Sequence, residues 1–387
     1  MHIFFDRFRI FLWGPPPRGP LFLCWFFLQF LLFPVAYILY PCGFKIVRWF
    51  RGLHPYKSRF AVVSIGNISV GGSGKSVAVR YFLSLIGEEK CAVVMRGYGG
   101  KASRTKKPTC VASQGDILCD VAQAGDEAYA LALSTKALVV VGGDKAASVA
   151  WCELQKKQEI THIILDDGHQ SWSVARDLDV VLVDGRAPLG NGHPLPLGPL
   201  REKDLSRADL IIITHAKDFS GEKQKKITEK IQPLLGRGVP IVWSAHHPAG
   251  VKQNNVVSVG AADLQGKDVV VLAGIGHPKG VVSSTKYLGM NVCATYFFPD
   301  HHSYSSDQLT CVVRDAAGRP VITTEKDWVK IAPLRDQKDV LSTSYWWVLT
   351  ISLAVSREGD ALLRHALSAL SPDAGTEAGG SKKGKTC

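Results

Sequence analysis

The fold of this chain is decided by Ile65-Gly66-Asn67-Ile68-Ser69-Val70-Gly71-Gly72-Ser73-Gly74-Lys75-Ser76. An apolar run rich in β-branched residues precedes this stretch at positions 61–65, and a helix-compatible run follows it at positions 77–86. A glycine-rich turn between a strand and a helix exposes backbone N–H groups at the helix N-terminus, where they bind anions. The strict form of this pattern has glycine where the chain has Ser69.

The last two residues of the stretch predict which anion binds. In a phosphate-binding loop the lysine, here Lys75, reaches the outer phosphates, and the hydroxyl that follows, here Ser76, ligates Mg²⁺. We therefore expect residues 66–76 to bind a nucleoside triphosphate. The alternative is a glycine-rich turn without a ligand, but strand, turn, Lys-Ser pair and helix follow one another in the required order.

The composition limits the classes of protein that need to be considered. With 387 residues and 46% hydrophobic residues, the chain can bury a large core and form two domains. Its net charge of +12 favours an acidic partner, such as an anionic lipid or a phosphorylated substrate. No zinc-finger spacing or RNA-binding aromatic signature supports nucleic acid. The nine cysteines are scattered, which fits a reducing compartment better than a disulfide framework.

An apolar segment near the N-terminus predicts contact with a membrane. Residues 21–40 are almost wholly apolar, long enough for a helix to span a bilayer, with a kink expected at Pro34. A buried core helix and a signal peptide are the alternatives, and no small-residue cleavage site follows the run. Whether the segment spans the bilayer or only inserts into it stays open.

Basic residues on either side of this segment predict its orientation. More of them follow the segment than precede it, so the positive-inside rule places residues 45 onward in the cytoplasm. The basic residues are Arg7, Arg9 and Arg18 before it and Lys45, Arg48, Arg51, Lys57 and Arg59 after it.

Beyond residue 60, apolar runs alternate with helical patterns. This alternation predicts a parallel sheet with helices on both faces, in which ligands bind at the carboxyl ends of the strands. The expected strands are 61–65, 92–95, 137–141, 162–165, 180–183, 210–214 and 239–243. The expected organisation is a membrane anchor (1–44), an α/β core (45–245), a connection (246–267), a second smaller α/β domain (268–370) and a disordered tail (371–387).

Two adjacent carboxylates, Asp166 and Asp167, follow the expected strand 162–165. An acidic residue at the end of an apolar strand is what a Walker B site uses to hold Mg²⁺, directly or through water. One carboxylate could ligate the metal while the other orients Lys75 or a water molecule. The alternative is a pair of helix-capping aspartates.

Three further segments carry polar groups where a ligand would be expected. Residues 96–100 combine Arg96 with glycines after a strand and suit contact with a phosphorylated ligand, although a plain turn is the alternative. Asp126 and Glu127 open a helical run, where acidic residues are common for reasons of the helix dipole. Residues 184–202 form a Gly/Pro-rich loop long enough to be functional, which ends in Arg201-Glu202.

The expected second domain has a cluster of its own in Asp300-His301-His302. These side chains could ligate a metal such as Zn²⁺ or supply a His–Asp pair for proton transfer, and a purely structural pair of histidines is the third possibility. Residues 323–327, which are polar and charged, form either a helix cap or a loop at the site.

Taken in order, these motifs resemble those of the tetraacyldisaccharide 4′-kinases, the lipid A pathway kinases. The resemblance covers residues 45–335 and the N-terminal helix. It rests on Gly66–Ser76, Arg96-Gly97-Tyr98, Gly125-Asp126-Glu127, residues 165–170, residues 190–202, residues 298–302 and residues 324–327.

The resemblance implies a P-loop NTPase core joined by a hinge to a smaller α/β domain. It implies transfer of the γ-phosphate of ATP, with Mg²⁺, to the 4′-hydroxyl of a tetraacylated disaccharide 1-phosphate, which gives lipid IVA. The enzyme would act at the inner face of the cytoplasmic membrane of a Gram-negative bacterium, its catalytic domains facing the cytoplasm. The resemblance indicates no oligomeric state.

The resemblance also implies roles for residues. Lys75 and Ser76 would bind the phosphates and Mg²⁺, and Asp126 would accept the proton of the sugar hydroxyl, assisted by His301 or His302. The remaining residues divide into those that serve the metal, Asp166, Asp167 and Glu202, and those that line the substrate or phosphate side, Arg96, Tyr98, Asn191 and Arg201.

The chain departs from the family pattern at Val77, Ala128, His169 and His193, which stand where Pro, Pro, Phe and Arg are usual. These residues flank the reacting groups, so fine substrate preference is affected rather than the reaction.

Three other functions remain possible from the sequence. A P-loop GTPase or metallochaperone would carry Asn-Lys-x-Asp after a late strand, where this chain has His215-Ala-Lys-Asp218. A membrane-attached interaction protein would have lost its phosphate loop, and a zinc hydrolase would use Asp300, His301 and His302.

Overall fold

The computed structural model describes residues 11–14, 21–155, 159–216, 219–253, 261–335 and 345–370. The expected disordered tail at 371–387 and the basic residues Arg7, Arg9 and Arg18 lie outside these ranges. Within them, the strands form a mixed sheet of 13 strands in the order β11-β10-β12-β13-β9-β8-β7-β1-β6-β2-β5-β3-β4.

The first part of the sheet contains all seven expected strands, and their bounds differ from the expected ones by three residues or fewer in all except β9. They pair in parallel because each is an apolar run that becomes buried between helices. An antiparallel edge pair, β3 and β4, was not expected. The strands are β1 (Ala61–Asn67), β2 (Cys91–Met95), β3 (Thr109–Ser113), β4 (Asp116–Ile117), β5 (Leu138–Val141), β6 (His162–Asp166), β7 (Leu178–Asp184), β8 (Leu210–Thr214) and β9 (Ile241–Gln253).

Helices cover both faces of this part of the sheet, as expected. Helices α4 (Lys75–Ile86) and α6 (Asp126–Ala132) bury apolar side chains on one face, and α7 (Lys145–Glu153) and α8 (Gly221–Ile231) do so on the other. Shorter helical segments complete the unit: η2 (Glu88–Lys90), η3 (Lys101–Arg104), α5 (Val121–Ala124) and η4 (Gln232–Leu234).

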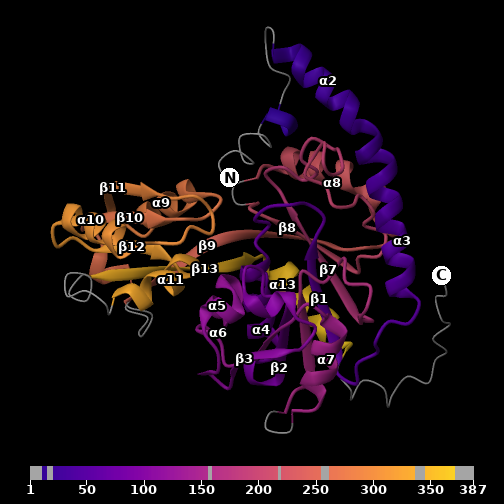
Figure 1. The fold of residues 1–387 in the computed structure, drawn as a ribbon, viewed down its shortest axis with the longest axis horizontal. Helices are drawn as coiled ribbons and strands as arrows, with labels where there is room; N and C mark the ends of the chain where they lie inside the picture. The colour runs from indigo at the N-terminus through magenta and orange to yellow at the C-terminus, as the bar shows by residue number, and fades with distance from the viewer. Residues whose placement is uncertain are drawn as a thin grey trace.

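The second part of the sheet has its own helices and core, and lies to one side of the first in Figure 1. Helix α9 packs on one face, and α10 and α11 pack on the other. The elements are η5 (Ala261–Leu264), β10 (Asp268–Ala273), α9 (Pro278–Tyr287), β11 (Asn291–Phe297), α10 (Ser306–Ala316), β12 (Val321–Thr324), α11 (Glu325–Arg335) and β13 (Trp346–Val355).

A single long strand joins the two parts and extends into the range 246–267, where we expected a connection and no strand. Strand β9 pairs in parallel with β8 at its start and then antiparallel with β13 along Ser244 to Gln253. Its second half escaped sequence analysis because His246, His247, Pro248 and Gly250 interrupt the apolar pattern. A register shift beside the β9 proline accommodates the missing N–H group.

The last helix also departs from the expected boundaries. Helix α13 (Arg357–Ser368) falls within the range assigned to the second domain, yet its Leu363 and Leu367 are buried in the core of the first unit with Phe82 of α4. The chain therefore returns to the first unit after β13, and the two units are tied by β9, β13 and α13 together.

The N-terminal helical run lies along the first unit, away from the second in Figure 1. It comprises α2 (Leu21–Pro34), a π-helical turn η1 (Val35–Leu39) and α3 (Tyr40–Gly52). The irregularity follows Pro34, where we expected a kink, because a proline removes one helical hydrogen bond. Among the described residues, this run contains one segment, Leu23–Phe50, long and apolar enough to cross a membrane by length and composition.

Candidate active site

The phosphate-binding loop connects β1 to α4 with the expected geometry. Gly74 has a left-handed backbone (φ 86°), and Lys75 begins the helix directly after it. The Lys75 ammonium donates to Asn67 Oδ1 over 3.2 Å and lies 3.5 Å from Asp167 Oδ1. The loop thus brings its lysine to the end of the neighbouring strand β6, where the two expected Walker B carboxylates lie.

The Gly/Pro-rich loop at 184–202 runs beside the phosphate-binding loop. Val70 N donates to Pro199 O over 2.8 Å, and Arg201 N donates to Ile68 O over 2.8 Å. This pairing places the Arg201 guanidinium against Asp167, with Nη1 2.8 Å from Oδ2. Asp167 therefore lies between two cations from two different loops.

Asp166 and Asp167 have opposite electrostatic surroundings. Burial opposes ionisation of Asp167, but Lys75 and Arg201 outweigh it and lower its pKa to about 2. Burial dominates at Asp166 and raises its pKa to about 6. Asp167 also has a left-handed backbone (φ 49°), a strained conformation that is concentrated at functional sites.

The groups around these carboxylates fit a magnesium ion. Asp166 Oδ1 and Ser73 Oγ are buried and lack a hydrogen-bond partner among the described residues. The described residues contain no group of three His, Cys, Asp or Glu side chains that could hold a metal alone. Magnesium is usually held by one or two carboxylates together with phosphate oxygens and water, so it needs no such group.

Sequence analysis missed a half-buried lysine beside the carboxylates. Lys145, the first residue of α7, donates to the carbonyl oxygens of Asp166 over 2.5 Å and of Asp167 over 2.7 Å. Burial lowers its pKa to about 8. Lys145 thus fixes the strained backbone at the end of β6. Its position at a helix start gave no signal, because its partners come from a distant strand.

Asp126 is contacted from the second unit. Its Oδ2 lies 3.2 Å from His301 Nδ1 and 3.1 Å from the Lys330 ammonium. Burial opposes ionisation of Asp126, but His301 and Lys330 outweigh it and lower its pKa. The hydrogen bond with Asp126 raises the pKa of His301 in turn. The structure therefore brings together Asp126 and His301, which are 175 residues apart in sequence.

Glycine is required directly before Asp126. Gly125 has a φ of 83°, and a Cβ atom there would lie 2.4 Å from the carbonyl oxygen of Tyr98. This close approach locks the start of α6 against the loop at 96–100. Arg96 and Tyr98 on that loop are exposed, and the Tyr98 ring lies 6.0 Å from the His301 ring. Both side chains are placed to meet a ligand.

Two more ion pairs connect the units around this point. Lys326 of α11 pairs with Glu127, and Glu325 pairs with Arg80 of α4 over 2.7 Å. Burial opposes ionisation of Glu127, but Lys326 and Lys75 lower its pKa, so this carboxylate lies within electrostatic range of the phosphate-binding loop. Because α4 begins at Lys75 and carries Arg80, the Arg80–Glu325 pair places α11, and with it the Asp126 cluster, beside the helix that follows the phosphate-binding loop. The role of residues 323–327, left open by the sequence, is to begin α11 at the contact between the units.

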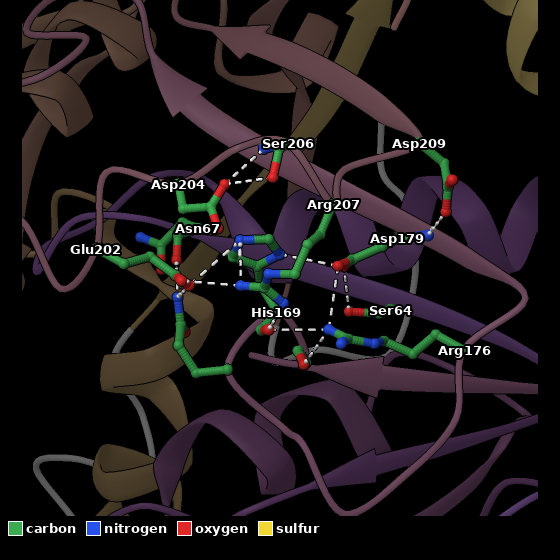
Figure 2. Close-up of polar contacts among 12 residues, drawn as sticks. Ser64, Asn67, His169, Arg176, Asp179, Glu202, Asp204, Ser206, Arg207 and Asp209 are labelled. Atoms are coloured by element: carbon green, nitrogen blue, oxygen red, sulfur yellow. Dashed lines mark hydrogen bonds and ion pairs between the residues drawn. The ribbon is translucent and has the colours of Figure 1, made fainter. Parts of the chain in front are cut away.

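Glu202 belongs to a buried network rather than to the exposed edge of the site, as Figure 2 shows. Its Oε1 accepts from Gln170 and lies 3.2 Å from His169 Nε2, and its Oε2 accepts from Arg207. Both oxygens are thus engaged in this network, and the metal-ligand role that we expected for Glu202 stays a prediction. Glu202 also supports Gln170, which donates to the carbonyl oxygen of Asn67 beneath the phosphate-binding loop.

Asn191 shapes its own loop. It donates to Leu197 O over 3.0 Å and accepts from His193 N over 3.1 Å. The same loop contacts the N-terminal segment, because Tyr37 hydrogen-bonds His193 and Trp13 donates to Pro196 O. The expected substrate-side loop therefore adjoins the apolar helix.

The two neighbouring histidines point to different partners, which argues against a zinc site. His301 contacts Asp126, whereas His302 stacks on Phe298 and lies 3.2 Å from Gln308 Oε1. His302 thus packs within the second unit, and His301 is the histidine at the contact between the units.

This combination of a phosphate-binding loop, strand-end carboxylates and a carboxylate–histidine pair on a parallel sheet defines a P-loop phosphotransferase. Comparison with known proteins gives the family. Residues 28–369 match the family model of LpxK, tetraacyldisaccharide-1-P 4′-kinase. The chain therefore belongs to the tetraacyldisaccharide 4′-kinase family, and the kinase activity predicted from the sequence is confirmed at the level of this family.

Individual relatives agree with this assignment. The chain is 36% identical over 293 residues to a tetraacyldisaccharide 4′-kinase of Anaeromyxobacter dehalogenans, covering 73% of this chain and 76% of that protein. It is 33% identical over 325 residues to one from Aeromonas hydrophila, covering 83% and 85%. The crystal structure of "apo" form LpxK from Aquifex aeolicus in complex with ATP superposes with a TM-score of 0.70 at 25% identity, covering 89% of this chain and 99% of that one.

Proposed function

We propose that this protein transfers the γ-phosphate of ATP to the 4′-hydroxyl of tetraacyldisaccharide 1-phosphate at the inner face of the bacterial cytoplasmic membrane. One observation carries the proposal: a phosphate-binding loop and an Asp–His pair, supplied by two units, adjoin at one edge of the sheet. A phosphoryl transfer to a sugar needs both, because the phosphates must be neutralised and the hydroxyl must lose its proton.

The first unit would bind the phosphates of ATP. The backbone N–H groups of the loop and the Lys75 ammonium would bind the ATP phosphates, with Arg201 close by. Ser76, Asp166 and Asp167 would hold Mg²⁺, which neutralises charge on the phosphates when bound. Lys75 and Arg201 hold Asp167 ionised, and a bound metal ion would favour the ionised form of Asp166 as well.

Asp126 would accept the proton of the 4′-hydroxyl. A carboxylate held ionised by cations can accept a proton within hydrogen-bond reach of the attacking hydroxyl. His301 would orient this carboxylate and stabilise its charge, because its Nδ1 contacts Asp126 Oδ2. Arg96 and Tyr98, exposed beside the pair, would contact the acceptor sugar or its phosphate.

The two-unit organisation would then control access. The base lies on α6 of the P-loop unit, and its histidine lies on the β11–α10 connection of the smaller unit. Movement of the smaller unit about β9 and β13 would make or break this pair. Closure would assemble the site and exclude water, which protects the γ-phosphate from hydrolysis.

The N-terminal helix would hold the enzyme beside its lipid substrate. Large apolar side chains such as Leu23, Phe27 and Phe30 are exposed on α2. The loop carrying Asn191 contacts this helical segment through Tyr37 and Trp13. An acylated disaccharide kept in the membrane by its chains would therefore reach the site along this side.

The test is transfer of label from γ-³²P-ATP to tetraacyldisaccharide 1-phosphate, with wild type and Lys75→Met measured side by side. The proposal predicts a labelled 4′-phosphate for wild type and at least a hundredfold less for Lys75→Met, because one phosphate-binding cation is worth several kcal/mol in the transition state. Equal labelling by the two proteins, or none by wild type with ATP bound, would contradict it.

A further inference from the structure

Helix α11 presents two lysines to two carboxylates. Lys326 and Lys330 are four residues apart, so they lie on one face of the helix. They contact Glu127 and Asp126, the first residues of α6. Because the resemblance to the kinase family assigns a role to Asp126 and none to Lys330, the second lysine needs an explanation.

The contacts on Asp126 are divided unequally between its two oxygens. His301 Nδ1 and the Lys330 ammonium both approach Oδ2, over 3.2 Å and 3.1 Å. Among the hydrogen bonds of the described residues, Oδ1 of Asp126 takes part in none. One oxygen is therefore held by two partners, and the other is left to receive a proton.

From this arrangement we infer that Lys330 is a positioning residue for the catalytic base, holding Oδ2 so that Oδ1 of an ionised Asp126 faces the acceptor hydroxyl. The inference rests on the proposed role of Asp126 as that base. Lys330 itself does not need to touch the sugar or ATP in order to act in this way.

Lys330 is fixed well enough to perform this role. Its side chain is 13% exposed, and that of Asp126 is 21% exposed, so the pair is largely shielded from water. The ammonium also lies 5.9 Å from the Tyr304 ring, whose hydroxyl donates to the buried Asp327. Asp327 accepts from Gly274 N as well, so α11 and the segment that carries His301 are fastened together.

The electrostatic surroundings of Asp126 support the same role. Its neighbours are Glu127 on its own helix, Lys326 and Lys330 on α11, and His301 with Asp300 on the β11–α10 connection. Burial favours the protonated carboxyl, and His301 and Lys330 reverse that preference. Removing the Lys330 charge would therefore raise the pKa of the Asp126 carboxyl, which is partly buried.

A merely structural role for Lys330 would be to hold the two units together. The chain offers a matched control for this role, because Arg80 and Glu325 form another ion pair between α4 and the same helix, without touching Asp126. Arg80→Met weakens the contact between the units and leaves the surroundings of Asp126 unchanged.

The experiment is the pH profile of kcat/KM for lipid phosphorylation by wild type, Lys330→Met, Lys330→Gln, Lys330→Arg and Arg80→Met. The quantity compared is the ratio of kcat/KM at pH 7.5 to that at pH 4.0, because the pKa of Asp126 in the wild type lies below its ordinary value near 4. A rise of about one unit in the pKa of the base would raise this ratio about two- to fivefold in the neutral variants. Lys330→Arg keeps the charge and should keep the wild-type ratio, and Arg80→Met should lower kcat/KM by the same factor at every pH.

The inference is overturned if Lys330→Met and Lys330→Gln, whichever of them folds, lose activity equally at all pH values, or if Arg80→Met changes the ratio as they do. Asp126→Asn separates this inference from the proposed function. Full activity of Asp126→Asn would remove the base itself. Loss of activity there, with an unchanged ratio in the neutral Lys330 variants, would remove only the role of Lys330.

Discussion

At the scale of single residues, His169 shows how a buried charge network supports the site. The imidazole is fully buried between Asp179 and Glu202, and Arg176 and Arg207 supply the two matching positive charges. These four charges sum to zero, and the imidazole links them: its Nδ1 lies 2.9 Å from Asp179 Oδ2, and its Nε2 lies 3.2 Å from Arg207 Nη2. Histidine at this position therefore serves as a polar link between the charged groups.

Asp179→Asn should destabilise the protein strongly at neutral pH. The substitution leaves Arg176 without its buried partner, and breaking such a pair costs about 3–5 kcal/mol. Thermal unfolding followed by circular dichroism would measure this cost. Asp204→Asn, on a half-exposed carboxylate that faces Arg48 over 3.8 Å, is the control and should cost no more than about 1 kcal/mol.

The cost of Asp179→Asn should also depend on pH. Burial opposes ionisation of Asp179, but His169 and Arg176 lower its pKa below the ordinary value near 4. Its contribution to the free energy of unfolding is therefore complete above pH 4 and is lost as the pH falls through the folded-state pKa. A difference between wild type and Asp179→Asn as large at pH 3 as at pH 7 would argue against an ionic role.

At the scale of elements, parallel strands were predictable and the joining strand was not. Strands β1, β6, β7 and β8 are continuous apolar runs, because both of their faces are buried. The second half of β9 is only partly buried, and its polar residues and proline are tolerated because β13 pairs along it. Strand β13, with which it pairs, lies about a hundred residues further along the chain, so no local sequence pattern indicates the pairing.

Helix α13 provides a test of how the units are joined. Leu363 is fully buried in the core of the first unit, whereas the adjacent Leu362 is 45% exposed. We predict that Leu363→Ala lowers the free energy of unfolding by about 2–5 kcal/mol, since it leaves a cavity, and that Leu362→Ala lowers it by less than about 1 kcal/mol. Equal effects of the two substitutions on the melting temperature would show that α13 does not pack as described.

The N-terminal helix makes a prediction about the lipid substrate. Leu23 and Phe30 are 71% and 73% exposed, so replacing both with glutamate should leave the fold intact while weakening membrane insertion. The double variant should lose at least tenfold more activity on substrate in phospholipid vesicles than on detergent-dispersed substrate. An equal loss on both substrates would mean that the helix serves folding rather than membrane attachment.

At the scale of the whole molecule, the sequence indicated the residues that follow strands and missed those that reach across the fold. Lys75, Asp166 and Asp167 are recognisable because the carboxyl ends of parallel strands meet at one edge. Lys145 and Lys330 were missed because they come from helices, and the partner of Lys326, in the segment 323–327 whose role was left open, is likewise selected only by tertiary packing. The four-residue spacing of Lys326 and Lys330 was the available signal, yet such pairs usually face solvent.

The contact between the units is also a property of the whole chain. His301 meets Asp126, Lys330 shares the same oxygen, and Arg80 pairs with Glu325, although the two sides are far apart in sequence. The motif order predicted roles for Asp126 and His301, and the fold brings the two side chains into contact, since each unit contributes one of them. The proposed mechanism therefore depends above all on Asp126 as the proton acceptor.

The most direct test of this claim is the turnover of Asp126→Asn on tetraacyldisaccharide 1-phosphate, with ATP binding measured on the same preparation. The isosteric amide keeps the shape of the side chain and cannot accept the proton. We predict a fall in kcat of at least a hundredfold, in line with the contribution of a positioned base, with the affinity for ATP within about threefold of wild type. Turnover close to wild type would contradict the account.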